Sequence, residues 1–451
     1  MRLSNLLAPD LVETLKQDPA QAAELAEELH AADLAELIDG LPDESAVLML
    51  DALPEHHAAA ALDAIKGSRR ADLFERLDRS KAARIADGMS ADERADLFQS
   101  LPEEVRADLL TRMPKAAQQD VRELLRYPEN TAGGRMTTDF AALSPLLTVE
   151  RAIEEVRRIA EDKETINEVY VVDPNGTLVG ALSLRTLVLA RAGQTLSAVM
   201  DADVVSVPPT MDQEDVARLF EHYELLAVPV VDEARKLLGI VTVDDVVTVL
   251  KQEQAEDIQK LGAMRPIEEG YFQTDFWTFV RKRAGWLIVI FMGEILTASV
   301  LEHYEAARKA FSSIEVFVPL IISSGGNTGS QASSLIIRGL ALGEFAVGDA
   351  VKILAREARV GLMLGAILGA IGVLRAVFVG HSGGGGMAAA VGLALIACVT
   401  FGSIVGALLP LLIKRLGFDP AVSSGPFIAS LVDVAGIVIY LKIAILILGA
   451  P

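Results

Sequence analysis

The sequence predicts a multidomain membrane protein, in which an α-helical superhelical domain and a duplicated α/β domain precede a five-helix α transmembrane domain. Three observations support this fold class. Apolar residues recur every twelve positions early in the chain, a strand–helix pattern then occurs twice, and the last part holds apolar stretches of about 20 residues, the length that crosses a bilayer. The chain has 451 residues, which is enough for two or three domains.

The charged residues divide the chain into two different parts. Residues 284–451 hold 9 Asp and Glu and 10 Lys and Arg, whereas residues 1–283 hold 53 acidic and 31 basic residues. A net charge of −22 on the first part argues against nucleic acid as a partner, because phosphate binding needs a basic patch. This charge suits cations, although an acidic surface also simply keeps a domain soluble.

The one cysteine, Cys398, excludes an intrachain disulfide and a zinc site built on several cysteines. The first residues do not form a secretory signal, since Pro9 and Asp10 interrupt their apolar run. We therefore expect the acidic part to stay in the cytoplasm.

Residues 1–128 are predicted to form the superhelical domain, because two apolar series with a period of twelve run through them. One series is Leu41, Leu53, Ile65, Leu77, Met89, Leu101 and Met113, and the other is Leu37, Met49, Ala61, Leu73, Ile85, Leu97 and Leu109. The first series is followed by proline at Pro42, Pro54, Pro102 and Pro114. Proline suits the first turn of a helix, so each unit is predicted to be a short amphipathic helix. Such units stack around one continuous core; a generic helical bundle is the alternative.

Residues 129–250 are predicted to form the α/β domain. The stretches "NEVYVVDPNGTLVGALSLRTLVLA" and "LLAVPVVDEARKLLGIVTVDDVVTVL" share one pattern: a strand, a turn at Asp173 or Asp232, a second strand and a helix. A further helix precedes each copy, near 149–160 and 212–222. This βαββα duplication resembles a tandem pair of CBS domains, with the signature "GIVTVDD" in the second copy and Thr186 in place of the usual acid in the first.

Residues 251–283 are predicted to be a connecting helix, and residues 284–451 the transmembrane domain. The predicted spans lie near 284–300, 314–342, 360–379, 387–412 and 421–448. With the amino terminus inside, the inner side collects Arg281, Lys282, Arg283 and most other Lys and Arg residues of this part, which is the positive-inside pattern. This orientation places the carboxyl terminus outside.

Asp433 lies twelve residues into the last predicted span, about 18 Å along a helix. A carboxylate at this depth is costly, and such residues usually face a water-filled path or a partner. The alternative is a protonated Asp433 satisfied by a neighbouring helix. Glu294 and Lys442 also lie within spans; Glu294 is predicted to line the same path or face an interior partner, and Lys442 to reach the outer surface.

The second predicted span has a polar centre. Residues 323–334, within "PLIISSGGNTGSQASSLIIRGLAL", are Ser, Gly, Asn, Thr, Gln and Ala only. Gly325, Gly326 and Gly329 allow close approach of a helix or a hydrated ion, and Asn327 offers a neutral oxygen. Polar backbone at membrane depth is tolerated where it is buried in protein or lines a cavity. The stretch therefore lines a pore beside Asp433 or packs helices together.

The residues of the spans favour Mg²⁺ over softer metals. No cluster of Cys or His lines the spans, which argues against copper and zinc. Mg²⁺ keeps several of its waters and binds through one or two carboxylates. Two copies of Asp433 facing each other across a two-fold axis would provide such a site, although the sequence does not prove a dimer.

These residues and their order resemble the MgtE-type family of magnesium channels over nearly the whole chain. The most specific segments are "YPENTAGGRMT" at 127–137, "GGNTGSQ" at 325–331 and "LVDVAGI" at 431–437. The resemblance implies a homodimer in the inner cell membrane with a pore on its two-fold axis. It also implies that Asp433 binds Mg²⁺ there, with Asn327 and the backbone near Ala429 shaping the site.

The resemblance further implies that cytosolic Mg²⁺ binds between the acidic N, CBS and connecting-helix domains and gates the pore. The matching residues are Asp92, Asp96, Glu214, Glu224, Asp245, Glu256, Asp257 and Asp419. Like-charged domains repel one another, so ions between them would hold a compact, closed state that their loss would release. The alternative for each residue is an ordinary solvated charge.

Some positions depart from the family pattern. Gly425 stands where members commonly have Asn, and Thr248 where some have a further acid. Some members bind ATP in the CBS cleft. Arg185 and Asp245 could serve here, but Leu225 replaces an aromatic residue that would stack on adenine.

We predict a Mg²⁺ channel that is not an enzyme. One alternative is a secondary carrier of divalent cations such as Mn²⁺ or Co²⁺, coupled to H⁺ or Na⁺ through Asp433. Another is a membrane enzyme regulated by its CBS domains, but the sequence offers no nucleophile–base pair, Walker loop or zinc motif. A non-conducting scaffold would leave Asp433 unexplained.

Overall fold

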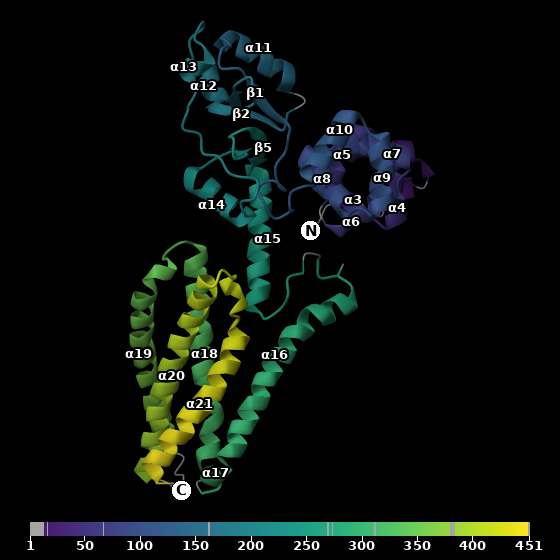
Figure 1. Ribbon diagram of the computed structural model, residues 1–451. Coiled ribbons are helices and arrows are strands. Elements are labelled where there is room, and N and C mark those ends of the chain that lie inside the picture. The colour runs from purple at the N-terminus through teal and green to yellow at the C-terminus, as the bar shows by residue number, and fades with distance from the viewer. Residues whose placement is uncertain are drawn as a thin grey trace. The chain divides into compact units, whose positions relative to one another are not determined.

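The computed structural model describes residues 13–15, 17–65, 67–160, 163–267, 270–272, 274–310, 313–378 and 384–449 (Figure 1). The chain forms two compact units, one up to Glu253 and the other from Gln254 onward. Each unit has apolar cores of its own.

The first unit begins with short helices that follow the twelve-residue repeat. They are α2 (Pro19–Glu27), α3 (Ala31–Gly40), α4 (Asp43–Ala52), α5 (Glu55–Ala64), α6 (Ser68–Arg76), α7 (Arg79–Asp87), α8 (Ala91–Ser100), α9 (Glu103–Arg112) and α10 (Lys115–Leu124). Residues of the first apolar series end several of these helices in an extended conformation, as Leu53 does after α4, and they are buried. An extended, buried residue stops each helix and turns the chain into the next one.

The prolines lie one position earlier than the repeat suggested. Pro42 and Pro54 precede the first helical residue in an extended conformation, and are therefore N-cap residues rather than members of the first turn. The carbonyl oxygen of Pro42 accepts the first helical hydrogen bond, from Ala46 N at 2.9 Å. Helix boundaries read from sequence commonly err by one or two residues in this way.

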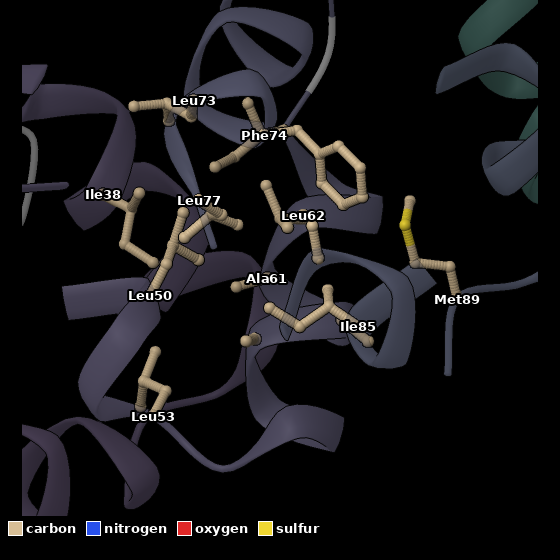
Figure 2. Packing of buried hydrophobic residues seen from close by; sticks show 14 of the residues in the cluster. Ile38, Leu50, Leu53, Ala61, Leu62, Leu73, Phe74, Leu77, Ile85 and Met89 are labelled. Carbon is tan, nitrogen blue, oxygen red and sulfur yellow. The ribbon is translucent and has the colours of Figure 1, made fainter. Parts of the chain in front are cut away.

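Each short helix packs on the helix two places further along the chain. α2 contacts α4, α3 contacts α5, and this alternation continues to the pair α8 and α10. Figure 2 shows the shared core, in which Leu50, Leu62, Phe74 and Ile85 come from successive helices and lie together. This arrangement confirms stacked units with one continuous core and excludes the generic bundle.

The duplicated α/β domain follows in the same unit. Its first copy contains β1 (Phe140–Leu143), α11 (Val149–Ile159), β2 (Thr165–Val172), β3 (Leu178–Ser183), α12 (Leu184–Leu189) and α13 (Leu196–Val199). Its second copy contains α14 (Gln213–Tyr223), β4 (Ala227–Val231), β5 (Leu237–Thr242) and α15 (Val243–Leu261). β1 pairs parallel to β2, while β2–β3 and β4–β5 are antiparallel, and Val207 forms a parallel bridge to Val230 in the place that β1 has in the first copy. The predicted βαββα duplication is therefore correct.

The expectation of one connecting helix over 251–283 is wrong. α15 starts at Val243 as the last helix of the second copy and continues without a break to Leu261. The described residues between Leu261 and α16 (Phe276–His303) are not helical, and the early turns of α16 contain Arg281–Arg283. Gly262 and Pro266 favour this interruption, because glycine ends helices readily and proline donates no backbone hydrogen bond.

The second unit consists mainly of long helices. Beyond α16 they are α17 (Glu305–Ala310), α18 (Ser313–Ala341), α19 (Ala350–Phe378), α20 (Gly384–Arg415) and α21 (Gly425–Leu448), with short 3₁₀ turns η2 (Val347–Asp349) and η3 (Pro420–Val422). α18, α20 and α21 all contact one another, α19 packs on α20, and α16 packs on α21. Each of the five predicted spans largely coincides with one long helix, although the last was predicted to start at 421 and α21 starts at Gly425.

Within the described residues, four segments are long and apolar enough to cross a membrane: Phe276–His303, Val347–Phe378, Gly385–Arg415 and Gly425–Leu448. α18 is not among them, although it has 29 residues, since its polar centre lowers its mean hydropathy. Its crossing of the membrane remains a prediction.

Candidate functional site

The polar centre of α18 is helical. Ser324 Oγ donates to the carbonyl of Leu320 at 2.6 Å, and Thr328 Oγ1 donates to the carbonyl of Ser324 at 2.8 Å. Asn327 Nδ2 donates to Ser323 Oγ at 3.2 Å. Because these side chains bond within their own helix, the segment needs no loop to satisfy its polar groups.

One face of α18 packs against α20 through glycine. A Cβ on Gly402 would lie 2.3 Å from the carbonyl oxygen of Gly325, and a Cβ on Gly406 would lie 2.1 Å from that of Gly329. No side chain fits at such distances, so the two backbones are in direct contact. The helix-packing interpretation is therefore correct for Gly325 and Gly329.

A different face of α18 lies against Asp433. A Cβ on Gly326 would lie 3.1 Å from Asp433 Oδ1 and 3.2 Å from Ala429 Cβ. The structure thus brings together three features that the sequence singled out. They are Asp433 of α21, Ala429 one turn earlier on the same helix, and the glycine-rich centre of α18. Asp433 is partly exposed, so its carboxylate is open to an ion or to water beside bare backbone.

Next to this contact, α18 carries an exposed polar stripe. Ser323, Asn327, Gln331 and Ser334 are spaced three or four residues apart and are exposed in the single chain, so they share one helix face. A polar stripe against lipid is unfavourable because hydrocarbon offers no hydrogen bonds. This face therefore requires water or another protein surface.

The loop before α21 is tied to α18 by two hydroxyls. Ser330 Oγ donates to the carbonyl of Gly425 at 2.9 Å, and Ser333 Oγ donates to the carbonyl of Ser423 at 3.1 Å. Members of the family commonly have Asn at this position, whereas here the backbone carbonyl of Gly425 accepts a hydrogen bond from Ser330. The start of α21 is held in place by α18, and Asp433 follows about two turns later.

At the same end of α21, a lysine joins two predicted metal ligands. Lys260 Nζ lies 2.5 Å from Glu256 Oε1 and 2.5 Å from Asp419 Oδ2. Asp257 is the residue after Glu256 on α15. The structure therefore brings Glu256 and Asp419 together as expected, but around the ammonium group of Lys260.

In the first unit, α8 packs on the second copy of the α/β domain. Ala91 and Ala95 share a core with Phe220 and Val246. This packing places Asp92 and Glu93, in the first turn of α8, opposite Asp245, in the first turn of α15. Their carboxylate oxygens lie within 4.8 Å of one another. Each group lies at a helix amino terminus, whose dipole favours negative charge.

This acidic cluster, Asp92, Glu93 and Asp245, has the character of a cation site. Asp92 Oδ1 is buried and has no hydrogen-bond partner among the described residues, whereas Glu93 pairs with Arg70. Burial, with the charge of Glu93, raises the pKa of Asp92 to about 6. Burial, with the charge of Asp92, raises the pKa of Asp245 to about 8. The ion-free cluster therefore retains protons that a metal ion would replace.

Sequence reasoning missed three acids in or near this cluster. Glu93 adjoins Asp92 and could have been suspected, and Asp63 belongs to an acidic series with the twelve-residue period. Burial raises the pKa of Asp63 to about 7 and that of Glu164 to about 7, and repulsion from Asp92 contributes to both. Glu164 carries no signal in the sequence, because only the fold brings it near α8.

The other predicted sensor residues of the first unit are Asp96, Glu214 and Glu224. Arg135 Nη1 lies 3.4 Å from Asp96 Oδ2, and burial raises the pKa of Asp96 to about 7 although Arg135 opposes the shift. Glu214 Oε1 pairs with Arg218 at 2.5 Å. Glu224 is exposed at the end of α14.

The two residues named for ATP, Arg185 and Asp245, have different surroundings. Arg185 is exposed on α12, while Asp245 accepts a hydrogen bond from Thr242 at 2.9 Å and faces Asp92. An acidic cluster repels a triphosphate, and Leu225 offers no ring to stack on adenine. Thr186, in place of the usual acid, lies in the first turn of α12, where its backbone N–H donates to the N-cap Ser183 Oγ at 3.1 Å.

Residues 318–443 match the family described as "MgtE: Divalent cation transporter", residues 29–130 match the "MgtE intracellular N domain", and residues 132–193 and 196–252 match the CBS domain. The magnesium transporter MgtE of Thermus thermophilus is 41% identical over 331 residues, which cover 73% of each chain. That of Enterococcus faecalis is 36% identical over 325 residues, 72% of this chain and 71% of the relative. A solved structure described as the cytosolic domain of the Mg²⁺ channel MgtE in complex with ATP is 38% identical, with a TM-score of 0.51, over 54% of this chain and 100% of that one.

Proposed function

Because the chain belongs to the MgtE family of magnesium transporters, we propose that it is a Mg²⁺-selective channel that takes up magnesium across the inner cell membrane and is closed by cytosolic Mg²⁺. The observation that carries this proposal is the position of the Asp433 carboxylate. It lies against the bare backbone of Gly326, partway along two helices that pack on each other. A carboxylate beside glycine attracts a cation and leaves room for the water that Mg²⁺ retains.

The pore forms between two copies of the chain. The stripe of Ser323, Asn327, Gln331 and Ser334 is exposed in one chain, and a second copy related by a two-fold axis would cover it with an identical polar stripe. Two Asp433 carboxylates would then face a common axis and hold one hydrated divalent ion. Neutral oxygens of Asn327 and of the backbone near Ala429 would shape the surrounding site.

Cytosolic Mg²⁺ closes this pore by binding to the acidic residues of the soluble part. The strongest support is the cluster of Asp92, Glu93 and Asp245, which joins α8 to the first turn of α15. Further sites involve Asp96, Glu214, Glu224, Glu256, Asp257 and Asp419. An ion that binds the compact arrangement more tightly than the open one shifts the population toward closure. α15 is continuous from Asp245 to Glu256, so one helix carries residues of both groups of predicted ligands.

ATP has no role in this proposal. The solved relative binds ATP. In this chain Asp245 belongs to an acidic cluster, which would repel a triphosphate, and Leu225 has no ring that could stack on adenine. Channel activity and closure by Mg²⁺ are therefore expected without nucleotide.

Transport by the purified chain in lipid vesicles tests the proposal against a secondary carrier. A channel passes Mg²⁺ down its own gradient and the membrane potential when no H⁺ or Na⁺ gradient is present, and Mg²⁺ inside the cytoplasmic face suppresses the flux. Influx that stops when a proton or sodium gradient is collapsed would instead establish a coupled carrier. The same assay with Mn²⁺ and Co²⁺ measures selectivity.

A further inference from the structure

The ammonium group of Lys260 lies between two acidic residues, Glu256 and Asp419, that are expected to bind Mg²⁺. Its Nζ lies 2.5 Å from both Glu256 Oε1 and Asp419 Oδ2, and 20% of its side chain is exposed. Burial lowers the pKa of Lys260, but the hydrogen bonds to Asp419 and Glu256 outweigh burial and raise the pKa above its ordinary value. Lys260 is therefore charged at neutral pH.

Both oxygens of Asp419 are engaged. Oδ1 accepts a hydrogen bond from Ala421 N at 2.8 Å, which caps η3, and Oδ2 accepts the ammonium of Lys260. An incoming metal ion must therefore share Oδ2 with the ammonium or displace it. Two cations on one carboxylate oxygen repel each other strongly at such short range, so displacement is favoured.

The charges at this place are only partly balanced. Glu256 and Asp419 carry two negative charges. Lys260 supplies one positive charge, whereas Mg²⁺ supplies two. Lys260 thus lies between the two carboxylates and neutralises less of their charge than Mg²⁺ would.

The contact made by Lys260 reaches the polar centre of α18. Asp419 and η3 lead directly to Ser423 and Gly425, whose carbonyls accept hydrogen bonds from Ser333 and Ser330 of α18. Asp433 and Gly326 meet further along the same two helices. A cation bound to Asp419, whether Lys260 or a metal ion, is therefore expected to affect the position of the segment that precedes α21.

We propose that Lys260 is a tethered competitor of Mg²⁺ at the Glu256–Asp419 pair, which holds the end of α15 to the loop before α21 when Mg²⁺ is scarce and swings aside when the ion binds. This inference rests on the proposed function, since it names a residue that sets the Mg²⁺ threshold for closure. It makes Lys260 a positioning residue that lowers Mg²⁺ affinity and retains a basal contact without the ion.

Protease protection of the full-length chain tests this role. Tyr271 and Phe272, in the segment after α15, are 75% and 97% exposed, and chymotrypsin cleaves after such residues without needing a lysine. Lys260→Met should increase cleavage there in the absence of Mg²⁺, because the two carboxylates then repel each other. It should also lower the half-protective Mg²⁺ concentration by about three- to fivefold, the range of a partly exposed ion pair.

Three variants make the outcome decisive. Lys260→Gln removes the charge with a polar side chain and should behave as Lys260→Met does, whereas Lys260→Arg keeps the charge and should stay near wild type. Lys251→Met, which removes an exposed lysine on the same helix, should have no effect. An unchanged or raised half-protective Mg²⁺ concentration in both charge-removing variants would overturn the competitor role, while protection of the wild type by Mg²⁺ would still support sensing. Wild-type cleavage that ignores Mg²⁺ would overturn both.

Discussion

Gly326 of α18 packs directly against the Asp433 carboxylate of α21. A Cβ on Gly326 would lie 3.1 Å from Asp433 Oδ1, a distance at which one of the two must move. We expect Gly326→Ala to reduce Mg²⁺ flux severalfold, because the methyl group occupies space that a hydrated ion needs beside the carboxylate. Flux into lipid vesicles measures the effect.

The control for that variant is Gly348→Ala. A Cβ on Gly348 meets nothing within 4 Å, so this change adds the same methyl group in open space and should leave flux unchanged. Wild-type flux in Gly326→Ala would mean that this glycine does not border the ion path.

Gly406 is expected to matter for stability rather than for conduction. Its added Cβ would lie 2.1 Å from the carbonyl oxygen of Gly329, which is backbone and cannot turn aside. Gly406→Ala should therefore destabilise the membrane unit by about 1–3 kcal/mol, the usual cost of overpacking. Thermal unfolding in detergent, with Gly285→Ala as a control in open space, tests this. Equal midpoints for the two variants would show that α18 and α20 are not in backbone contact.

Mg²⁺ binding to the soluble part should weaken as the pH falls from 8 to 6. The ion binds ionised carboxylates, and the ion-free chain holds Asp92 and Asp245 with pKa values of about 6 and about 8. Below each value a proton must leave before the ion binds, so affinity falls by up to about tenfold per pH unit for each proton displaced. Thermal shifts produced by Mg²⁺ at several pH values measure this, and Asp245→Asn should flatten the dependence while Asp72→Asn, at an exposed acid, should not.

The same raised pKa values predict how pH acts without Mg²⁺. Between the ordinary value of 3.8 and the raised values, the folded chain binds protons that the unfolded chain has released. The stability of the first unit should therefore fall as the pH rises through this window, and Mg²⁺ should restore it above pH 7. Stability that rises with pH in metal-free buffer would contradict the buried acidic cluster.

Glu294 is expected to strengthen cation attraction beside Asp433. α16 meets α21 where Ser430 Oγ donates to the carbonyl of Ile290 at 3.4 Å, and Glu294 lies one turn after Ile290 on α16, as Asp433 lies about one turn after Ser430 on α21. Glu294 has no ion-pair partner among the residues that the structure describes. Glu294→Gln should raise the Mg²⁺ concentration for half-maximal flux without changing closure by internal Mg²⁺, whereas Glu302→Gln at the end of α16 should change neither.

Periodic residues carried most of the fold prediction. Leu53 and its equivalents recur every twelve positions because each helix repeats the same packing, so one rule predicts many helices. The boundaries of helices and domains were harder to predict. α15 runs through the expected domain boundary, since Val243–Leu261 has no residue that stops a helix, and the role of Pro42 as a cap depends on backbone angles that the sequence does not specify.

Some residues of the candidate sites could be predicted from the sequence, and others could not. Asp433 was found because a carboxylate is rare in an apolar helix, and Gly326 because glycine is abundant in the span beside it. Lys260 could not be assigned to Asp419, which is 159 residues away, because nothing local marks a contact that only the folded chain makes. Glu93 remained an ordinary surface acid until the packing of α8 placed it beside Asp245.

The most direct measurement is Mg²⁺ flux through Asp433→Ala and Asp433→Asn compared with wild type, each reconstituted at equal density in lipid vesicles. Asp349→Ala, at the exposed turn before α19, controls for the loss of an acid elsewhere. Both Asp433 variants are expected to fold and to lose nearly all flux, while Asp349→Ala retains it. Undiminished flux in a folded Asp433→Ala chain would show that this carboxylate does not bind the transported ion.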